Sequence, residues 1–264
     1  FTTIEEDTTP PVISDIQTSY ITSNSATITW TTDEPSTSLV KYGTTSGSYP
    51  YSQEDTSYTT SHSITLTNLQ PNTTYYFVVN STDKAGNSAQ SSEYKFTTNA
   101  WEYIWIEAED ADTITPDFKI VNDTSASNSK YIWVPEGAGW HPKRGEAIYT
   151  IHIHSPGNYV IWGRIFANTI SNNSFFVQMD DSPDYLWTIT PSNSWQWDEV
   201  NHWGNGTETD PEIDPVIFTL SEGEHTLRIK QREDGTKLDK LLVTNDIKYT
   251  PFNPPSIVSF SPEN

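Results

Sequence analysis

Three carboxylates beyond residue 100 have the types and spacing of a cation site. In the stretch 106–110, the two-residue period of a β-strand places Glu107 and Glu109 on one face, where their charges repel unless a cation lies between them. Asp239 is an acid in an otherwise apolar stretch, so we expect it to point inward and to need a partner. Hard oxygen ligands suit Ca²⁺, and one shared ion would satisfy all three acids. The alternative is that Glu107 and Glu109 form a solvated pair on an edge strand.

Four tryptophans fall in the polar, mostly irregular stretch 180–209. They are Trp187, Trp195, Trp197 and Trp203, with asparagine and histidine between them. Sugar recognition needs flat aromatic faces that stack on pyranose rings, flanked by planar hydrogen-bonding groups. Trp195 and Trp197 share a face by their spacing, so this pair is expected to form either a sugar platform or a plug at the end of a β-sandwich.

Aromatic residues beside cations give a second set of candidates. Trp140 precedes a short basic cluster that ends at Arg144, and a guanidinium binds a carboxylate through two hydrogen bonds. This pattern indicates a site for a uronate or sulfated sugar, to which Arg164, Arg232 and Lys237 are candidate contributors. The alternatives are an ordinary turn with solvated charges at 140–144 and, for Arg232, neutralisation of nearby acids.

Catalytic motifs are absent from the sequence. No carboxylate lies in a recognisable glycosidase motif, and neither Gly-x-Ser-x-Gly nor His-Glu-x-x-His occurs. His152 and His154 share a strand face, but a zinc site would need a third ligand that the sequence does not identify. We therefore predict a protein that is not an enzyme.

The composition favours an all-β protein that avoids nucleic acid. The chain has 264 residues, among them 10 Trp, 14 Tyr, 10 Phe and no Cys, and aromatic and β-branched residues suit pleated strands. The net charge of −21 repels phosphate backbones. No apolar run is long enough to insert into a membrane.

Short apolar runs separated by turn signals predict two β-sandwich domains with a boundary near Asn99-Ala100. We expect a linker at 1–8, a first domain at 9–98, a second at 101–250, and a linker with the start of a further β-domain at 251–264. The strands expected in the second domain are 103–109, 130–134, 147–154, 159–166, 174–179, 216–220, 225–231 and 238–244.

The first domain resembles the fibronectin type III family over about 9–98. The resemblance is carried by Trp30, by the pattern Leu-x-Pro-x-Thr-x-Tyr at 69–75 and by the stretch 83–87. It implies a fibronectin type III-like β-sandwich in which the Tyr75 hydroxyl bonds back to upstream backbone. Such domains are usually spacers or adhesive modules.

The second domain resembles carbohydrate-binding modules of families six and thirty-five over about 101–248. The resemblance is carried by the early Glu-Ala-Glu at 107–109, the stretch 159–164, the pair Trp195 and Trp197, and the closing stretch 223–239. It implies a β-jelly roll with a structural Ca²⁺ held by Glu107, Glu109 and Asp239 and by backbone carbonyls near Lys130. Where these modules often place Asn before the last strand, this chain has Thr236 or Lys237, so neutral-sugar binding at that site is not expected.

We therefore predict a calcium-stabilised carbohydrate-binding module on a fibronectin type III spacer, which attaches a larger secreted or cell-surface protein to polysaccharide or glycan. The candidate ligand-binding residues are Trp140, Arg164, Trp195, Trp197, Arg232 and Lys237. The alternative is a structural segment of a surface layer, sheath or adhesin without sugar binding. The stretch 251–264 repeats the Pro-Pro-x-Ile opening at 10–13 and is similar to repeat-domain starts in archaeal surface proteins, which suggests neighbouring domains.

Overall fold

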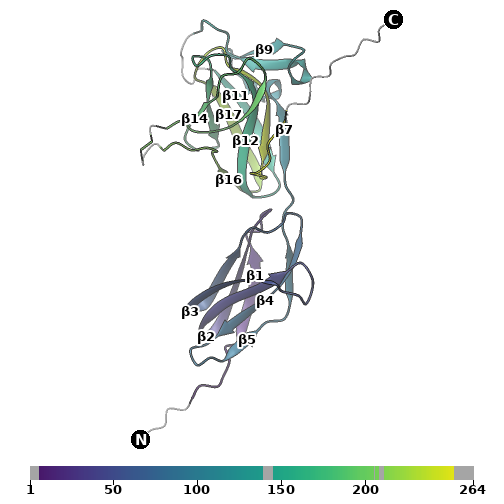
Figure 1. The fold of residues 1–264 in the computed structure, drawn as a ribbon, viewed down its shortest axis with the longest axis vertical. Helices are drawn as coiled ribbons and strands as arrows, with labels where there is room; N and C mark the ends of the chain where they lie inside the picture. The colour runs from purple at the N-terminus through teal and green to yellow at the C-terminus, as the bar shows by residue number, and fades with distance from the viewer. Residues whose placement is uncertain (1–5, 139–144, 205, 208–210, 253–264) are drawn as a thin grey trace, which may run out of the picture. The chain divides into compact units, whose positions relative to one another are not determined.

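The computed structural model describes residues 6–138, 145–204, 206–207 and 211–252. It contains two compact units, Phe1–Trp101 and Glu102–Asn264, and both consist of β-strands and connecting loops (Figure 1). The all-β fold class predicted from the sequence is confirmed. Among the described residues, no helix is long and apolar enough to span a membrane. The tail from 253 onward, where a further β-domain is predicted, and the cluster at 140–144 lie outside the described residues.

Unit 1 is an antiparallel sheet in the order β1-β2-β4-β5, with β3 paired to β2 and β6 paired to β4. Its strands are β1 (Ile13–Ser19), β2 (Ala26–Gly43), β3 (Tyr51–Leu66), β4 (Thr74–Thr82), β5 (Ser88–Gln90) and β6 (Tyr94–Thr97). Ala26, Ile28 and Trp30 alternate into the core as predicted. The Tyr75 hydroxyl accepts a hydrogen bond of 2.9 Å from the backbone N–H of Gln70, which confirms the predicted tyrosine corner.

Unit 2 packs two antiparallel sheets around one apolar core. The seven-stranded sheet has the order β15-β12-β18-β10-β9, with β16 on β12 and β7 on β18, and the five-stranded sheet has the order β14-β13-β17-β11-β8. The strands are β7 (Tyr103–Glu107), β8 (Thr113–Ile114), β9 (Lys119–Asn122), β10 (Lys130–Trp133), β11 (Glu146–Ile153), β12 (Gly157–Phe166), β13 (Ser174–Met179), β14 (Tyr185–Thr188), β15 (Gln196–Glu199), β16 (Phe218–Leu220), β17 (Gly223–Gln231) and β18 (Lys237–Thr244).

The apolar residues of β12 decide which side chains of the seven-stranded sheet face outward. Ile161 and Ile165 are fully buried in the core between the sheets. Because successive strand residues point to opposite faces, Trp162, Arg164 and Phe166 lie on the outer face. That outer face carries the candidate functional site.

A bulge in β18 gives Asp239 its place in this sheet. Arg164 pairs with Lys240 and Ile165 pairs with Leu238, so Asp239 is the extra residue between two paired positions. The Asp239 side chain is completely buried, as its apolar surroundings in the sequence predict. The bulge breaks the alternation of the strand, which leaves Asp239 and Lys240 both available to the face that carries Arg164.

Candidate functional site

A cluster of four aromatic rings lies on the outer face of the seven-stranded sheet. Trp133 of β10 and Phe166 of β12 each lie opposite Lys237 of β18. Trp195, just before β15, makes edge contacts with Tyr131 at 5.7 Å and with Phe166 at 5.9 Å between ring centroids. We call Tyr131, Trp133, Phe166 and Trp195 the Trp195 platform.

Two cations are built into the Trp195 platform. The Arg164 guanidinium lies 5.3 Å from the Trp195 ring centroid, within the range of a cation–π interaction. The Lys237 ammonium lies 4.8 Å, 5.0 Å and 5.7 Å from the ring centroids of Phe166, Tyr131 and Trp133. A flat ligand with hydroxyl or anionic substituents would therefore meet apolar ring surface and hydrogen-bond donors together.

Arg164 is held in place by the buried Asp239. Its guanidinium forms an ion pair with the Asp239 carboxylate, which also accepts a hydrogen bond of 2.8 Å from the backbone N–H of Ser127. Burial raises the pKa of Asp239, while the hydrogen bond and charge of Arg164 act in the opposite direction. Asp239 therefore fixes the orientation of Arg164 over Trp195, so the residue predicted as a metal ligand also supports the Trp195 platform.

The structure gathers four of the six ligand-binding candidates. Arg164, Trp195 and Lys237 belong to the Trp195 platform or its cations, and Trp197 lies opposite Arg164 on β15. Trp140 lies outside the described residues.

Arg232 does not join this group. It follows β17 of the five-stranded sheet, where it pairs with Glu233 and donates to the Ser174 hydroxyl at 2.8 Å. This ion pair agrees with the alternative interpretation, in which Arg232 neutralises a nearby acid.

Sequence reasoning missed three rings of the platform and misjudged two other tryptophans. Tyr131, Trp133 and Phe166 each lie in a short apolar run whose pattern indicates a strand but not which face is exposed. Trp187 is fully buried in the core, and Trp203 is 61% exposed beside β14, so neither belongs to the platform. The described part of the stretch 180–209 is mostly irregular, as predicted, but it contains two short strands, β14 and β15, that the sequence did not predict.

The predicted calcium ligands lie at the edge of the same sheet, but not on one strand face. β7 ends at Glu107, and Ala108–Asp110 forms a single 3-10 turn that places Glu109 beyond the strand. The prediction that Glu107 and Glu109 share a strand face is therefore wrong, because the two-residue period stops at this turn. Lys130 begins β10 immediately after a second 3-10 turn, Ser127–Ser129.

Two carboxylate oxygens at this edge are buried without a partner. Glu107 Oε1 accepts hydrogen bonds from Lys240 Nζ at 2.6 Å and Ser127 Oγ at 3.0 Å, and Glu109 Oε1 accepts one from Asn128 Nδ2 at 2.9 Å. Glu107 Oε2 and Glu109 Oε2 have no hydrogen-bond partner among the described residues. A buried carboxylate oxygen without a partner loses its hydration, so these two oxygens fit a cation.

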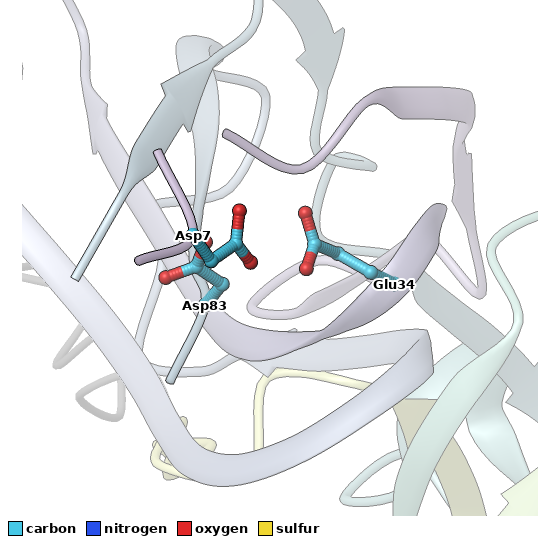
Figure 2. Close-up of side chains that lie close together, drawn as sticks. All are labelled: Asp7, Glu34 and Asp83. Carbon is cyan, nitrogen blue, oxygen red and sulfur yellow. The ribbon is translucent and has the colours of Figure 1, made fainter. Parts of the chain in front are cut away.

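Unit 1 holds a separate group of acids, shown in Figure 2. Oxygens of Asp7, Glu34 and Asp83 all lie within 4.8 Å of one another, and no other set of three metal-ligating side chains is as close in the described parts of the chain. Asp83 is buried and accepts hydrogen bonds of 2.8 Å from the backbone and side chain of Asn87. Burial, then the charges of Asp7, Asp83 and Asp33, raise the pKa of Glu34.

The edge strand β15 carries two acids that titrate near neutral pH. Burial raises the pKa of Asp198 to about 6, although its carboxylate accepts a hydrogen bond of 2.7 Å from Trp187 Nε1. Burial and the charges of Asp214 and Asp198 raise the pKa of Glu199 to about 7. Glu199 Oε1 has no hydrogen-bond partner among the described residues.

We expect unit 2 to lose stability as the pH rises from 5 to 8. A carboxyl group whose folded-state pKa is raised stabilises the fold below its unfolded pKa, and this contribution is lost as the pH rises through the folded value. Glu199→Gln removes the charge, so it should flatten the pH dependence and raise the free energy of unfolding at pH 8 by about 1 kcal/mol after solvent screening. Thermal melts at several pH values test this, with the exposed Glu224→Gln as the control. Equal pH slopes for the wild type and Glu199→Gln would contradict it.

Comparisons with known proteins give two family matches. The model of the purple acid phosphatase N-terminal domain matches residues 13–98, and that of the glycosyl hydrolase family 115 C-terminal domain matches residues 98–255. The first match covers the region where the sequence resembles fibronectin type III domains. No curated protein matches the chain.

Solved structures resemble about half of this chain at low identity. The C-terminal family 6 carbohydrate-binding module of a marine laminarinase from Zobellia galactanivorans is 15% identical, with a TM-score of 0.40, and the match covers 54% of this chain and 99% of that one. A family 35 carbohydrate-binding module from Clostridium thermocellum is 16% identical, with a TM-score of 0.39 and coverages of 54% and 97%. A family 115 4-O-methyl-α-glucuronidase with specificity for decorated arabinogalactans is 12% identical, with a TM-score of 0.37, and the match covers 53% of this chain and 17% of that one.

Proposed function

The chain belongs to the family of glycosyl hydrolase family 115 C-terminal domains through residues 98–255, and from this premise we propose that unit 2 is a non-catalytic module that binds polysaccharide or glycan. Unit 1 is a spacer in this proposal. The two units together attach a larger secreted or cell-surface protein to its carbohydrate. The family name supports an association with carbohydrate-active proteins, and the binding itself is argued from the site.

The observation that carries the proposal is the Trp195 platform. Three of its rings, Trp133, Phe166 and Trp195, are half-buried and lie side by side on one sheet face. Aromatic side chains bury large areas with few rotatable bonds, which suits stacking against the apolar face of a sugar ring. Arg164 and Lys237 supply donors for hydroxyl or carboxylate oxygens beside those rings.

A purely structural segment would be expected to bury its tryptophans completely. Trp105 on the same sheet face is 45% exposed, and Trp133, Trp195 and Trp197 are each half-buried. This partial exposure favours ligand binding over the alternative of a surface-layer or sheath segment that has lost it.

Affinity electrophoresis of the full chain tests the proposal. In native gels that contain neutral or acidic soluble polysaccharides, the wild type should be retarded by at least one of them. Trp195→Ala should migrate as in a gel without polysaccharide, whereas Trp203→Ala, which removes an exposed tryptophan outside the platform, should be retarded like the wild type. If Trp195→Ala and Trp203→Ala reduced the retardation equally, the Trp195 platform would not be the binding site.

The proposal includes a structural Ca²⁺ at the edge of the same sheet. Glu107 and Glu109 would hold it through their unpartnered oxygens, with Asp239 and the backbone carbonyl of Lys130 as further ligands. Carboxylate and carbonyl oxygens are the ligands that Ca²⁺ prefers. Glu107, Glu109 and Asp239 carry three negative charges, and the described structure pairs them with two cations, Lys240 and Arg164. The ion would supply the positive charge that is missing.

We expect chelation with EDTA to lower the melting temperature of unit 2. A ligand that binds only the folded state at a concentration one hundred times its Kd stabilises by about 2.7 kcal/mol. The double variant Glu107→Gln, Glu109→Gln should melt at the same temperature with and without EDTA. The control is Asp7→Asn with Glu34→Gln in unit 1, which should keep the response. If the effect of EDTA on the melting temperature disappeared only in this control, the ion would bind at the acidic group of unit 1 instead.

A further inference from the structure

A second group of exposed aromatic residues lies farther along the same sheet face. Trp105 of β7 and Trp197 of β15 meet edge to face, with 5.7 Å between their ring centroids. Trp105 is 45% exposed and Phe252, which lines the same groove, is 75% exposed. This groove has a volume of about 560 Å³, within the range of small-molecule binding sites.

The groove combines apolar rings with polar groups. Lys240 Nζ lies 5.7 Å from the Trp105 ring centroid, and Arg164, Ser125 and Ser127 also line the groove. Rings that can stack beside hydroxyl and cationic donors form the kind of surface on which the Trp195 platform is proposed to bind sugar. Lys240 Nζ has three N–H donors and directs two of them to Glu107 and Ser127, at 2.6 Å and 3.4 Å. A purely apolar partner would leave the third donor without a hydrogen bond, which favours a polyhydroxylated ligand.

The groove and the Trp195 platform are continuous across Arg164. This side chain lies over Trp195, pairs with Trp197 in the strand register and lines the groove. On β12, Phe166 belongs to the Trp195 platform, and Trp162 lies opposite Leu242, which in turn lies opposite Trp105. Phe166 and Trp162 are four positions apart along the strand. This spacing is about 13 Å, which is longer than one pyranose ring.

We propose that Trp105 and Trp197 form a second sugar subsite, so that unit 2 binds an extended run of sugar residues across the sheet face rather than a single terminal sugar. This inference rests on the proposed function. Arg164 lies between the two subsites and would donate to the sugar that links them. The ligand class is therefore an oligosaccharide long enough to contact both Trp195 and Trp105.

Calorimetric titration of the full chain with oligosaccharide ladders tests the inference. The probes are neutral gluco-, xylo-, manno- and galacto-oligosaccharides and acidic galacturono-oligosaccharides of one to six residues. For a ladder that binds, the wild-type affinity should rise with length and reach a plateau once both subsites are filled. Trp105→Ala should lower the affinity for the hexasaccharide about tenfold and leave the disaccharide unchanged. Trp105→Phe, which keeps a stacking ring, should recover most of the loss.

The outcomes separate the inference from the proposed function. Affinity that does not depend on length, together with an unchanged hexasaccharide affinity in Trp105→Ala, would overturn the second subsite and leave the Trp195 platform intact. If no oligosaccharide of any ladder bound to the wild type, both the second subsite and the proposed function would be overturned. Trp105 lies partly exposed on β7, which among the described strands pairs with β18 alone, so the variant should fold, and an unchanged melting temperature checks this.

Discussion

In EDTA, which also removes the proposed Ca²⁺, Arg164→Ala is expected to destabilise unit 2 by about 3–5 kcal/mol, because the fully buried Asp239 carboxylate then has no cation beside it. The matched control is Arg228→Ala on the other sheet. Arg228 pairs with Glu146 at 3.3 Å, with both side chains partly exposed, and such pairs contribute about 0–1 kcal/mol. Denaturant unfolding of the two variants measures the difference. A loss in Arg164→Ala no larger than that in Arg228→Ala would contradict the account.

The same variant should recover stability in acid. Burial already raises the pKa of Asp239, and removal of Arg164, which lowers it, should raise the pKa further. An acid with a raised folded-state pKa stabilises the fold at low pH and loses that contribution as the pH rises. The gap between wild type and Arg164→Ala should therefore narrow from pH 8 to pH 5. Glycan binding should fall with the loss of Arg164 at both pH values, since the cation over Trp195 is gone.

Trp187→Ala is expected to have the second large effect, a loss of about 3–5 kcal/mol in the free energy of unfolding of unit 2. Trp187 is fully buried, and its indole fills the space above Gly163, where a Cβ would come within 2.2 Å of Trp187 Cη2. The variant also removes the donor to Asp198. Trp203→Ala, which removes a tryptophan that is 61% exposed, should cost less than 1 kcal/mol. Similar losses in the two variants would show that Trp187 is not a core residue.

The sequence predicted the strands of unit 2 best where they are buried. The runs around Ile161, Val177, Leu227 and Leu241 are apolar because both sheets bury their inner faces, and each lies in a strand of the structure. β14 and β15 were missed because they are short strands in a polar segment. β14 pairs with the preceding strand β13 and β15 pairs with the more distant β12, and no periodic pattern in four residues predicts either pairing.

The candidate site was predicted in part for a similar reason. Trp195 and Lys237 were identifiable from their types, but the register that places Phe166 and Trp133 opposite Lys237 is a property of strand pairing. Trp105 was overlooked because its own stretch looks like an ordinary strand. The need of Asp239 for a partner was predictable, whereas its pairing with Arg164 depends on a bulge that the sequence does not reveal.

The central claim is that the Trp195 platform binds carbohydrate, and a glycan-array screen of the full chain in Ca²⁺ tests it most directly. Trp195→Ala, Trp133→Ala and the control Trp203→Ala should be screened beside the wild type after thermal melts show that each folds. The account predicts that the wild type and Trp203→Ala bind the same class of glycan and that both platform variants lose it. Silence of the wild type across neutral and acidic glycans would contradict the account and favour a structural role.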